Sequence, residues 1–561
     1  MIAMTDHELG DDQRAPSNGG HDAERPEASG GGEVPAALPN HPADITPGFG
    51  LAGQPFGLDI LGNGPIEPTR RRAMPVLVSA VAVVAVIAGG VTYVGFRAAS
   101  GKGGQPDTWA PANSIAFAKF DLDPSSAQQT AAWQFEQKFP SAPHVSKAGD
   151  LKDALLGAAF KKQAGDTTDF AADVKPWLGD QVAVAVFTDG LMKPVTVEIL
   201  QVTDAAKAKA GLAKISKDNA AGSTGRPPSG YTVEGGYAII GETQSIVDDA
   251  VAAARKSNIG DNATYGSDIA TLKGDRIATG WVDLTAVMKL TTAAQGQLAT
   301  GGMLLPGGLG GIAGAGAGGT GLKGRMVAGL RVEANAVELE GRQIGADLTA
   351  YKNGKAGAML GELPSGTVFG LAESGLGDIA KQSLAALEKS PQVGGGLLQQ
   401  ITALNNVNGL NLPTDAYNLL GGEFAIGVDD VPAVGGSAST LKVTAISEPV
   451  DAAKGLETAQ KLAVLASLGG FPVTASASGS QVVITNDKAA SGKLGSDADF
   501  KVAMAGMPDQ TSAAYYVNLS SFWNSEIGSG VSADMQHLSG VGMYQGISGA
   551  DVVFSIRLTV K

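Results

Sequence analysis

Two stretches decide the organisation of the chain: Val195–Lys207, which reads VTVEILQVTDAAK, and Leu441–Lys454, which reads LKVTAISEPVDAAK. In each, alternating apolar residues typical of a half-buried β-strand lead to an aspartate and then to a helix-forming segment. Aspartate is favoured at helix N-caps because its oxygens accept hydrogen bonds from the free N–H groups of the first turn. A strand, a cap and a helix start therefore occur twice, with Lys207 and Lys454 lying 247 positions apart.

Other segments match in the same order around these two stretches. Pro111 with Ile115 and Phe117 matches Pro364 with Val368, Trp177–Gly179 matches Leu419–Gly421, GGYAII from Gly235 matches GSQVVI from Gly479, Trp281–Leu284 matches Tyr516–Leu519, and VAGLRV from Val327 matches VFSIRL from Val553. The offset drifts along the series, as loop insertions and deletions would cause. We therefore predict a tandem duplication, with repeat 1 over residues 108–351 and repeat 2 over residues 358–561.

Within each repeat, strand-like runs alternate with helical stretches. We expect a strand pair near 181–202, a capped helix from Asp204, a hairpin near 231–240 and a helix after Gly241. Glu333–Ala336 (EANA) separates two further strand-like runs and fits a tight hairpin turn. The expected fold class is α+β, with mostly antiparallel sheets and packed helices. The sequence leaves open whether the repeats share one sheet or form separate lobes.

An uncharged segment, Met74–Phe96, precedes the repeats. At about 1.5 Å per residue a helix of this length spans about 34 Å, enough to cross a bilayer. Arg70, Arg71 and Arg72 adjoin its N-terminal end, and the positive-inside rule places that end in the cytoplasm. We predict an uncleaved single-pass helix in the plasma membrane, a linker over residues 97–107 and extracytoplasmic repeats.

The tail before this segment, residues 1–73, is rich in Gly, Pro and acidic residues and is expected to be disordered in the cytoplasm. Its segment 47–62 concentrates apolar residues that could order on a cytoplasmic partner, although a plain linker is the favoured interpretation. These residues are Phe49, Phe56, Leu58, Ile60 and Leu61.

Composition excludes several classes of function. The net charge is −14 and no basic cluster is longer than Arg70–Arg72, which argues against nucleic acid as a partner. Cysteine is absent, so there are no disulfides, thiolate metal sites or cysteine nucleophiles. Only His144 and His537 lie within the repeats, and no G-x-S-x-G nucleophile motif occurs in a strand-to-helix context. We predict no catalytic residues and no cofactor.

Asp121 and Asp123 form the best acidic pair and are weak candidates for a hard cation such as calcium, since alternate strand residues share a face. The favoured alternative is a strand end followed by Asp123 as a helix N-cap, with Pro124 at the first helical position.

Residues 300–324 form a Gly-rich segment in which Gly314, Gly316 and Gly319 satisfy G-x-G-x-x-G. The strand and helix of a dinucleotide site are missing from its surroundings, so we expect a low-complexity loop. Its apolar residues leave a lipid or partner contact open. They are Met303, Leu304, Leu305, Leu309 and Ile312.

The stretch Trp109–Pro140, WAPANSIAFAKFDLDPSSAQQTAAWQFEQKFP, resembles the domain-of-unknown-function family 3352, membrane-anchored proteins of actinobacteria and other bacteria. The second repeat has Ala372–Gly375 in place of the DLDP of Asp121–Pro124. The resemblance implies a membrane-anchored envelope protein and carries no activity.

Taken with the missing catalytic motifs, these features favour a non-enzymatic envelope module that binds a ligand, a lipid or a protein partner. Two alternatives stay open. One is an envelope enzyme whose carboxylates are brought together by the fold, and the other is a transmembrane relay through the tail.

Overall fold

The computed structural model describes residues 105–139, 169–189, 193–222, 229–293, 323–348, 351–352, 354–388, 409–429, 441–523 and 533–561. The tail with its segment 47–62, the predicted membrane span with Arg70–Arg72, and the Gly-rich segment up to residue 322 lie outside these residues, as does the linker up to residue 104. Among the helices described, none combines the length and the apolar character needed to cross a membrane.

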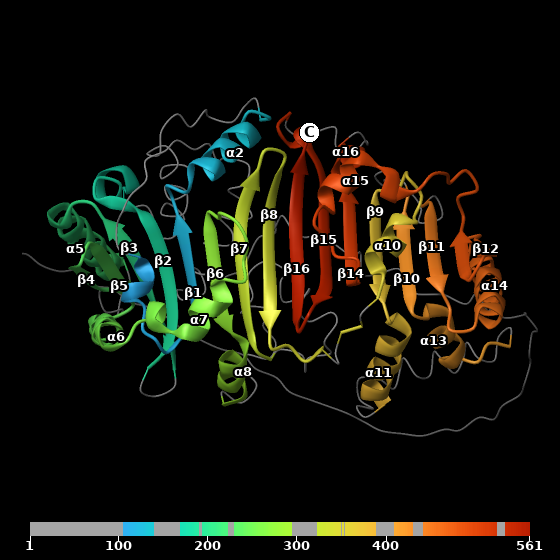
Figure 1. The fold of residues 1–561 in the computed structure, drawn as a ribbon, viewed down its shortest axis with the longest axis horizontal. Coiled ribbons are helices and arrows are strands. Elements are labelled where there is room, and N and C mark those ends of the chain that lie inside the picture. The colour runs from blue at the N-terminus through green and yellow to red at the C-terminus, as the bar shows by residue number, and fades with distance from the viewer. Residues whose placement is uncertain are drawn as a thin grey trace, which may run out of the picture. The chain divides into compact units, whose positions relative to one another are not determined.

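The described strands form one antiparallel sheet of sixteen, which confirms the α+β class. The two predicted repeats therefore share a sheet, joined where β8 pairs with β16. Figure 1 shows these two strands side by side, one yellow and one red, although they lie far apart in the sequence. The strands are β1 (Ser114–Asp121), β2 (Leu178–Thr188), β3 (Pro194–Val202), β4 (Gly230–Glu234), β5 (Tyr237–Gly241), β6 (Ala278–Asp283), β7 (Arg325–Glu333), β8 (Ala336–Ile344), β9 (Phe369–Ser374), β10 (Glu423–Val428), β11 (Val443–Glu448), β12 (Thr474–Ser478), β13 (Gln481–Thr485), β14 (Thr511–Asn518), β15 (Leu538–Ser548) and β16 (Asp551–Val560).

The strand order is the same on both sides of the β8–β16 pair. Outward from the centre, the first half reads β8-β7-β6-β1-β2-β3-β5-β4 and the second half reads β16-β15-β14-β9-β10-β11-β13-β12. Each strand of the first half (β1–β8) thus has its equivalent eight strands later in the second half (β9–β16).

Helices pack on both faces of the sheet. They are α2 (Ser126–Glu136), α5 (Ala205–Gly222), α6 (Gln244–Lys256), α7 (Ala263–Ile269), α8 (Leu284–Ala293), α10 (Ala356–Gly361), α11 (Leu376–Glu388), α13 (Thr414–Leu420), α14 (Ala452–Leu468), α15 (Ala498–Ala503) and α16 (Leu519–Trp523). Short helical turns are η1 (Pro106–Trp109), η3 (Phe170–Val174), η4 (Ile259–Asp261), η7 (Leu494–Ser496) and η9 (Met535–His537).

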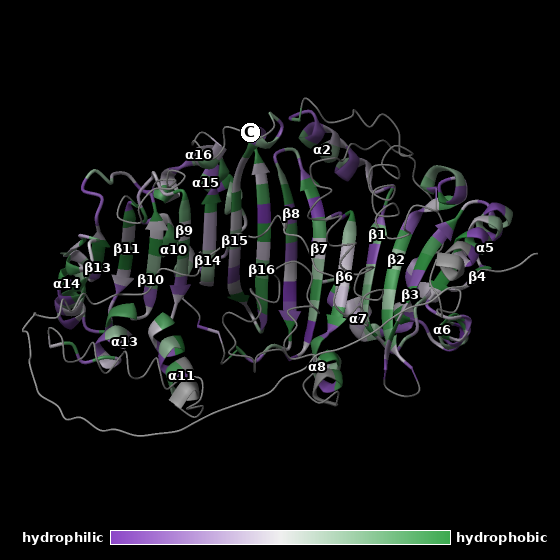
Figure 2. Ribbon diagram, turned by 180° about the vertical axis from the view of Figure 1, so that it is seen from behind, coloured by the Kyte–Doolittle hydropathy of each residue, from purple (hydrophilic) through white to green (hydrophobic). Residues whose placement is uncertain are grey.

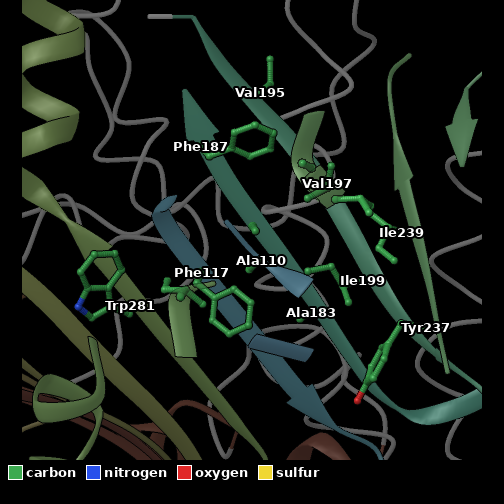
Figure 3. Packing of buried hydrophobic residues seen from close by; sticks show 14 of the residues in the cluster. Ala110, Phe117, Ala183, Phe187, Val195, Val197, Ile199, Tyr237, Ile239 and Trp281 are labelled. Atoms are coloured by element: carbon green, nitrogen blue, oxygen red, sulfur yellow. The ribbon is translucent and has the colours of Figure 1, made fainter. Parts of the chain in front are cut away.

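The main core of the first half lies under α6 and α7. Phe117 and Trp281 are directly paired across β1 and β6, and both are buried against Tyr265 of α7. Figure 3 shows Phe117 and Trp281 in this cluster with side chains of β2, β3 and β5. In the second half α10 and α15 cover the same face, where Phe500 meets Tyr516 edge to face.

Several local predictions are confirmed. Asp204 and Asp451 cap α5 and α14, accepting hydrogen bonds from the N–H of Lys207 and Lys454, each at 3.1 Å. Glu333 pairs with Ala336 across a two-residue hairpin turn. The strand pair β2–β3, the hairpin β4–β5 and the helix α6 lie where the sequence places them.

One match in the repeat series is wrong. Val327 lies on β7 and Val553 on β16, but the strand order makes β15 the equivalent of β7 and β8 the equivalent of β16. Both strands belong to hairpins and alternate apolar residues with polar or small ones, so their sequence pattern does not distinguish one member of a hairpin from the other.

Candidate functional site

Two rows of apolar side chains cross the centre of the sheet on one side, which we call the apolar face. Directly paired residues of neighbouring strands point to the same face, so the pairing defines each row. The first row is Leu330, Leu339, Ile556, Met543, Tyr515, Leu371 and Ile426, and the second is Val332, Val337, Leu558, Val541, Val517, Phe369 and Val428.

The rows are covered at one end and open to solvent in the second half. Leu330, Val332 and Val337 are buried in a cluster that includes Phe135 of α2. Phe369, by contrast, is 45% exposed. The neighbouring Leu371, Val517 and Val541 are half-buried and belong to none of the hydrophobic clusters formed by the described residues.

The alternation that creates this face is visible along the strands. Figure 2 shows hydrophobic and hydrophilic residues alternating along β8 and β16, in the middle of the sheet. Since successive residues of a strand point to opposite faces, this alternation separates an apolar face from a charged one.

Polar groups border the rows. The Tyr515 hydroxyl donates a hydrogen bond of 3.0 Å to Oε1 of Glu373 on the adjacent strand. Burial raises the pKa of Tyr515, and the charge and hydrogen bond of Glu373 raise it further, so the phenol stays protonated at neutral pH. A hydroxyl and a carboxylate beside an apolar surface are groups that can orient the polar end of a bound molecule.

The opposite face, the charged face, carries an ion-pair cluster where the two halves meet. Glu338 of β8 lies between Arg331 of β7 and Arg557 of β16, with N–O distances of 2.6 and 2.9 Å to Oε2. The Ser555 hydroxyl donates to Oε1 of Glu338 at 2.8 Å. Glu338 is only 2% exposed and Arg557 5%.

Glu333 completes this cluster through an ion pair with Arg557. Burial alone would raise the pKa of Glu333, but the hydrogen bond and charge of Arg557 outweigh it and hold the pKa below its ordinary value. The acidic and basic groups of the cluster bind one another, which suits a structural joint between β8 and β16.

A family model described as "protein of unknown function (DUF3352)" matches residues 77–499. The chain belongs to this family. The match begins inside the predicted membrane span and ends in α15, before the last three strands. No curated protein and no solved structure matches this DUF3352 chain.

The acidic pair of the DUF3352 chain lies at the end of β1. Oδ1 of Asp121 accepts a hydrogen bond of 2.9 Å from the N–H of Asp123. Burial raises the pKa of Asp121, and the charges of Asp123 and Asp180 add to the effect. No group of three or more His, Asp or Glu side chains suited to a metal ion occurs in the described ranges.

The expectation that Asp123 caps the following helix is wrong. Ser125 is the N-cap of α2, accepting from the N–H of Gln128, and the helix begins at Ser126. The Asp123 carboxylate instead accepts from Nε2 of Gln129 at 3.2 Å. Serine caps as well as aspartate, so Asp123 and Ser125 could not be ranked from the sequence.

The remaining candidates give no further site. His537 lies in η9 and meets Phe139 at a ring-centroid distance of 6.4 Å, while His144 lies outside the described residues. Gly314, Gly316 and Gly319 also lie outside them, as do Met303, Leu304, Leu305, Leu309 and Ile312.

Sequence reasoning missed the apolar face. Most of the strands that build it were recognised, although β15 was not. A row across a sheet also requires the order of the strands, and β8 beside β16 is a contact between distant segments. The one available signal was the apolar triple Val368–Gly370 (VFG) at the start of a predicted strand, with Phe369 at its centre.

Proposed function

We propose that this chain is a non-enzymatic binding module of the cell envelope whose apolar face receives the acyl chain of a lipid. In this proposal residues 74–96 anchor the protein in the plasma membrane, residues 1–73 lie in the cytoplasm and the sheet lies outside the cell. The net charge of −14 supports a partner other than nucleic acid. The halves derive from one duplicated unit, which their shared strand order supports.

The observation that carries the proposal is the open part of the apolar face around Phe369. Contiguous exposed apolar surface on a folded protein commonly marks a contact site. A fully buried methylene contributes about 0.8 kcal/mol, and a methylene that lies on an open face with one side still in water contributes about half of that. The site is therefore expected to favour longer acyl chains.

The test is native mass spectrometry of residues 105–561, a segment that contains all sixteen strands. The purified segment is examined for a retained lipid and then titrated with saturated fatty acids of increasing length. We expect a bound lipid mass that is lost on denaturation, and affinity that rises about twofold per added methylene at about 0.4 kcal/mol each.

The matched variants are Phe369→Gln and Trp133→Gln. Phe369 is 45% exposed on the apolar face and Trp133 is 44% exposed on α2, so both substitutions remove an equally exposed aromatic ring. Phe369→Gln should weaken binding and Trp133→Gln should leave it unchanged. A bare protein mass at every chain length, or equal effects of the two substitutions, would contradict the proposal.

A further inference from the structure

The two outermost strands of the sheet, β4 and β12, are equivalent in the strand order, but only β4 is protected. Figure 1 shows them at opposite ends of the sheet. α6 packs against β4 and β5, and Oε1 of its Gln244 accepts a hydrogen bond of 3.1 Å from the N–H of Tyr231 on the outer strand. That side chain occupies one of the backbone donors that an edge strand would offer to another chain.

Among the described residues of the second half, no helix equivalent to α6 covers the outer edge. Where α6 stands in the first half, only Asn486–Lys493 connect β13 to η7. Four of the five residues of β12 are exposed, whereas β4 has one buried residue and four half-buried ones. The free edge of β12 is therefore open to a further strand.

The helices beside the two edges, α5 and α14, also differ in their exposed side chains. Val464 of α14 lies ten residues after Lys454, and the residue ten positions after the matched Lys207 is Lys217. Val464 is 54% exposed and Leu468, one turn further on, is 78% exposed. An exposed lysine in the first half is thus replaced by exposed apolar side chains in the second.

Charge is absent from the whole edge of the second half. No Asp, Glu, Lys or Arg occurs from Leu462 to Asn486, which includes the end of α14, β12 and β13. The corresponding stretch of the first half, Ile215–Glu242, carries five charged residues: Lys217, Asp218, Arg226, Glu234 and Glu242. Charges and lysines at sheet edges prevent edge-to-edge pairing, and the second half has lost them.

We infer that β12 is the docking edge for a second copy of this chain, which pairs antiparallel with it across a two-fold axis. Self-pairing suits this edge because a two-fold axis perpendicular to the sheet places both α14 helices on the same face. The two α14 helices, which carry the exposed Val464 and Leu468, then lie on one side of the new seam. Each copy has a net charge of −14, but Leu462–Asn486 carries no charge. Two copies can therefore meet at this edge without repulsion between like charges.

The hairpin fixes which backbone groups of β12 face outward. Ser478 and Gln481 flank the two-residue turn that starts at Gly479, whose φ is 63°, and form a hydrogen-bonded pair. Hydrogen-bonded and non-hydrogen-bonded pairs alternate, so Ser476 bonds to β13 while the backbone groups of Ala475 and Ala477 face outward.

The register that uses the outward groups of both residues in both copies pairs Ala475 of one copy with Ala477 of the other. Ser476 then lies opposite its own counterpart. The two Ser476 form a non-hydrogen-bonded pair, in which Cα atoms are about 4.5 Å apart. That separation falls within the range of about 4.4–6.8 Å compatible with a disulfide.

Because the chain has no cysteine, Ser476→Cys in the full chain is a clean test. Cells expressing the variant are treated with copper–phenanthroline, and whole extracts are run on non-reducing gels. We expect most of the chain at twice the monomer mass, and its return to monomer after reduction. Thr232→Cys, the equivalent position on β4, should stay monomeric under the same treatment.

A second variant tests the helix contribution. Adding Val464→Lys and Leu468→Lys to Ser476→Cys restores charge at the edge through two exposed positions and should reduce the cross-linked fraction at least tenfold. Absence of a dimer while the introduced thiol of Ser476→Cys reacts with maleimide would overturn the inference. So would equal cross-linking of Thr232→Cys, or a cross-link that joins this chain to a different protein.

Discussion

Glu338 is the residue on which the joint between the halves depends most. It is nearly fully buried and accepts hydrogen bonds from two guanidinium groups, one on either neighbouring strand. Removing the charge of Glu338 leaves Arg331 and Arg557 to share the carboxylate of Glu333. One positive charge in this largely buried cluster is then uncompensated, which is much more costly than losing an exposed pair.

We expect Glu338→Gln to lower the free energy of unfolding by about 3–5 kcal/mol. Urea denaturation of residues 105–561 at neutral pH, followed by tryptophan fluorescence, measures the change. The control is Glu457→Gln, which removes an exposed pair with Lys461 on α14 and should leave the midpoint unchanged. Equal midpoints for the two variants would show that the buried cluster does not hold the joint.

At the scale of single elements, the two caps Asp204 and Asp451 begin equivalent helices. Hydrogen bonds from the backbone N–H of Lys207 and of Lys454 hold the pKa of each carboxyl below its ordinary value of 3.8. A depressed pKa in the folded state means that the cap stabilises the protein above that pH. The contribution is lost as the pH falls through the lower folded value.

Asp204→Ala and Asp451→Ala should each lower the thermal midpoint at pH 7, whereas the asparagine variants should keep most of it because asparagine also caps. Calorimetry at pH 7 and at pH 2.5 measures both effects. The difference between wild type and the alanine variants should narrow at the lower pH. A deficit that is the same at both pH values would mean that the carboxylate charge has no part in capping.

Local elements could be predicted because their causes are local. The Glu333–Ala336 turn and the aspartate caps depend on residues within four positions of each other. The start of α2 was placed wrongly because Asp123 and Ser125 are both good caps. In the fold Ser125 caps the helix, and the Asp123 carboxylate accepts a hydrogen bond from the side chain of Gln129 instead. The predicted equivalence of β7 and β16 was wrong because the alternating pattern of a strand does not indicate which strands pair with it.

At the scale of the whole described sheet, the halves are joined by the pairing of β8 with β16 and by the ion pairs of Arg557. A chain cut between β8 and α10 should therefore stay together. We expect the fragments of a variant with a protease site between residues 348 and 354 to co-elute in size-exclusion chromatography after cleavage, and to separate in urea. Separation under native conditions would contradict the shared sheet.

The arrangement of the halves could not be predicted from the sequence. The matched segments indicated two similar units. The pairing of β8 with β16, however, joins residues such as Leu339 and Ile556 that lie more than two hundred positions apart, and no local pattern predicts it. The apolar face arises only from that pairing, since its rows draw one residue from each of seven strands. The candidate site therefore depends on long-range packing, whereas most of the strands that build it, β15 excepted, could be predicted from local sequence.

Photo-crosslinking with a diazirine-bearing fatty acid tests the central claim most directly. Residues 105–561 are irradiated with the probe, digested and sequenced by mass spectrometry. We expect adducts on β9, β14 and β15, at or beside Phe369, Val517 and Val541, and their loss when excess palmitate competes. Adducts confined to other strands, or labelling that palmitate does not reduce, would contradict an acyl-chain site on the apolar face.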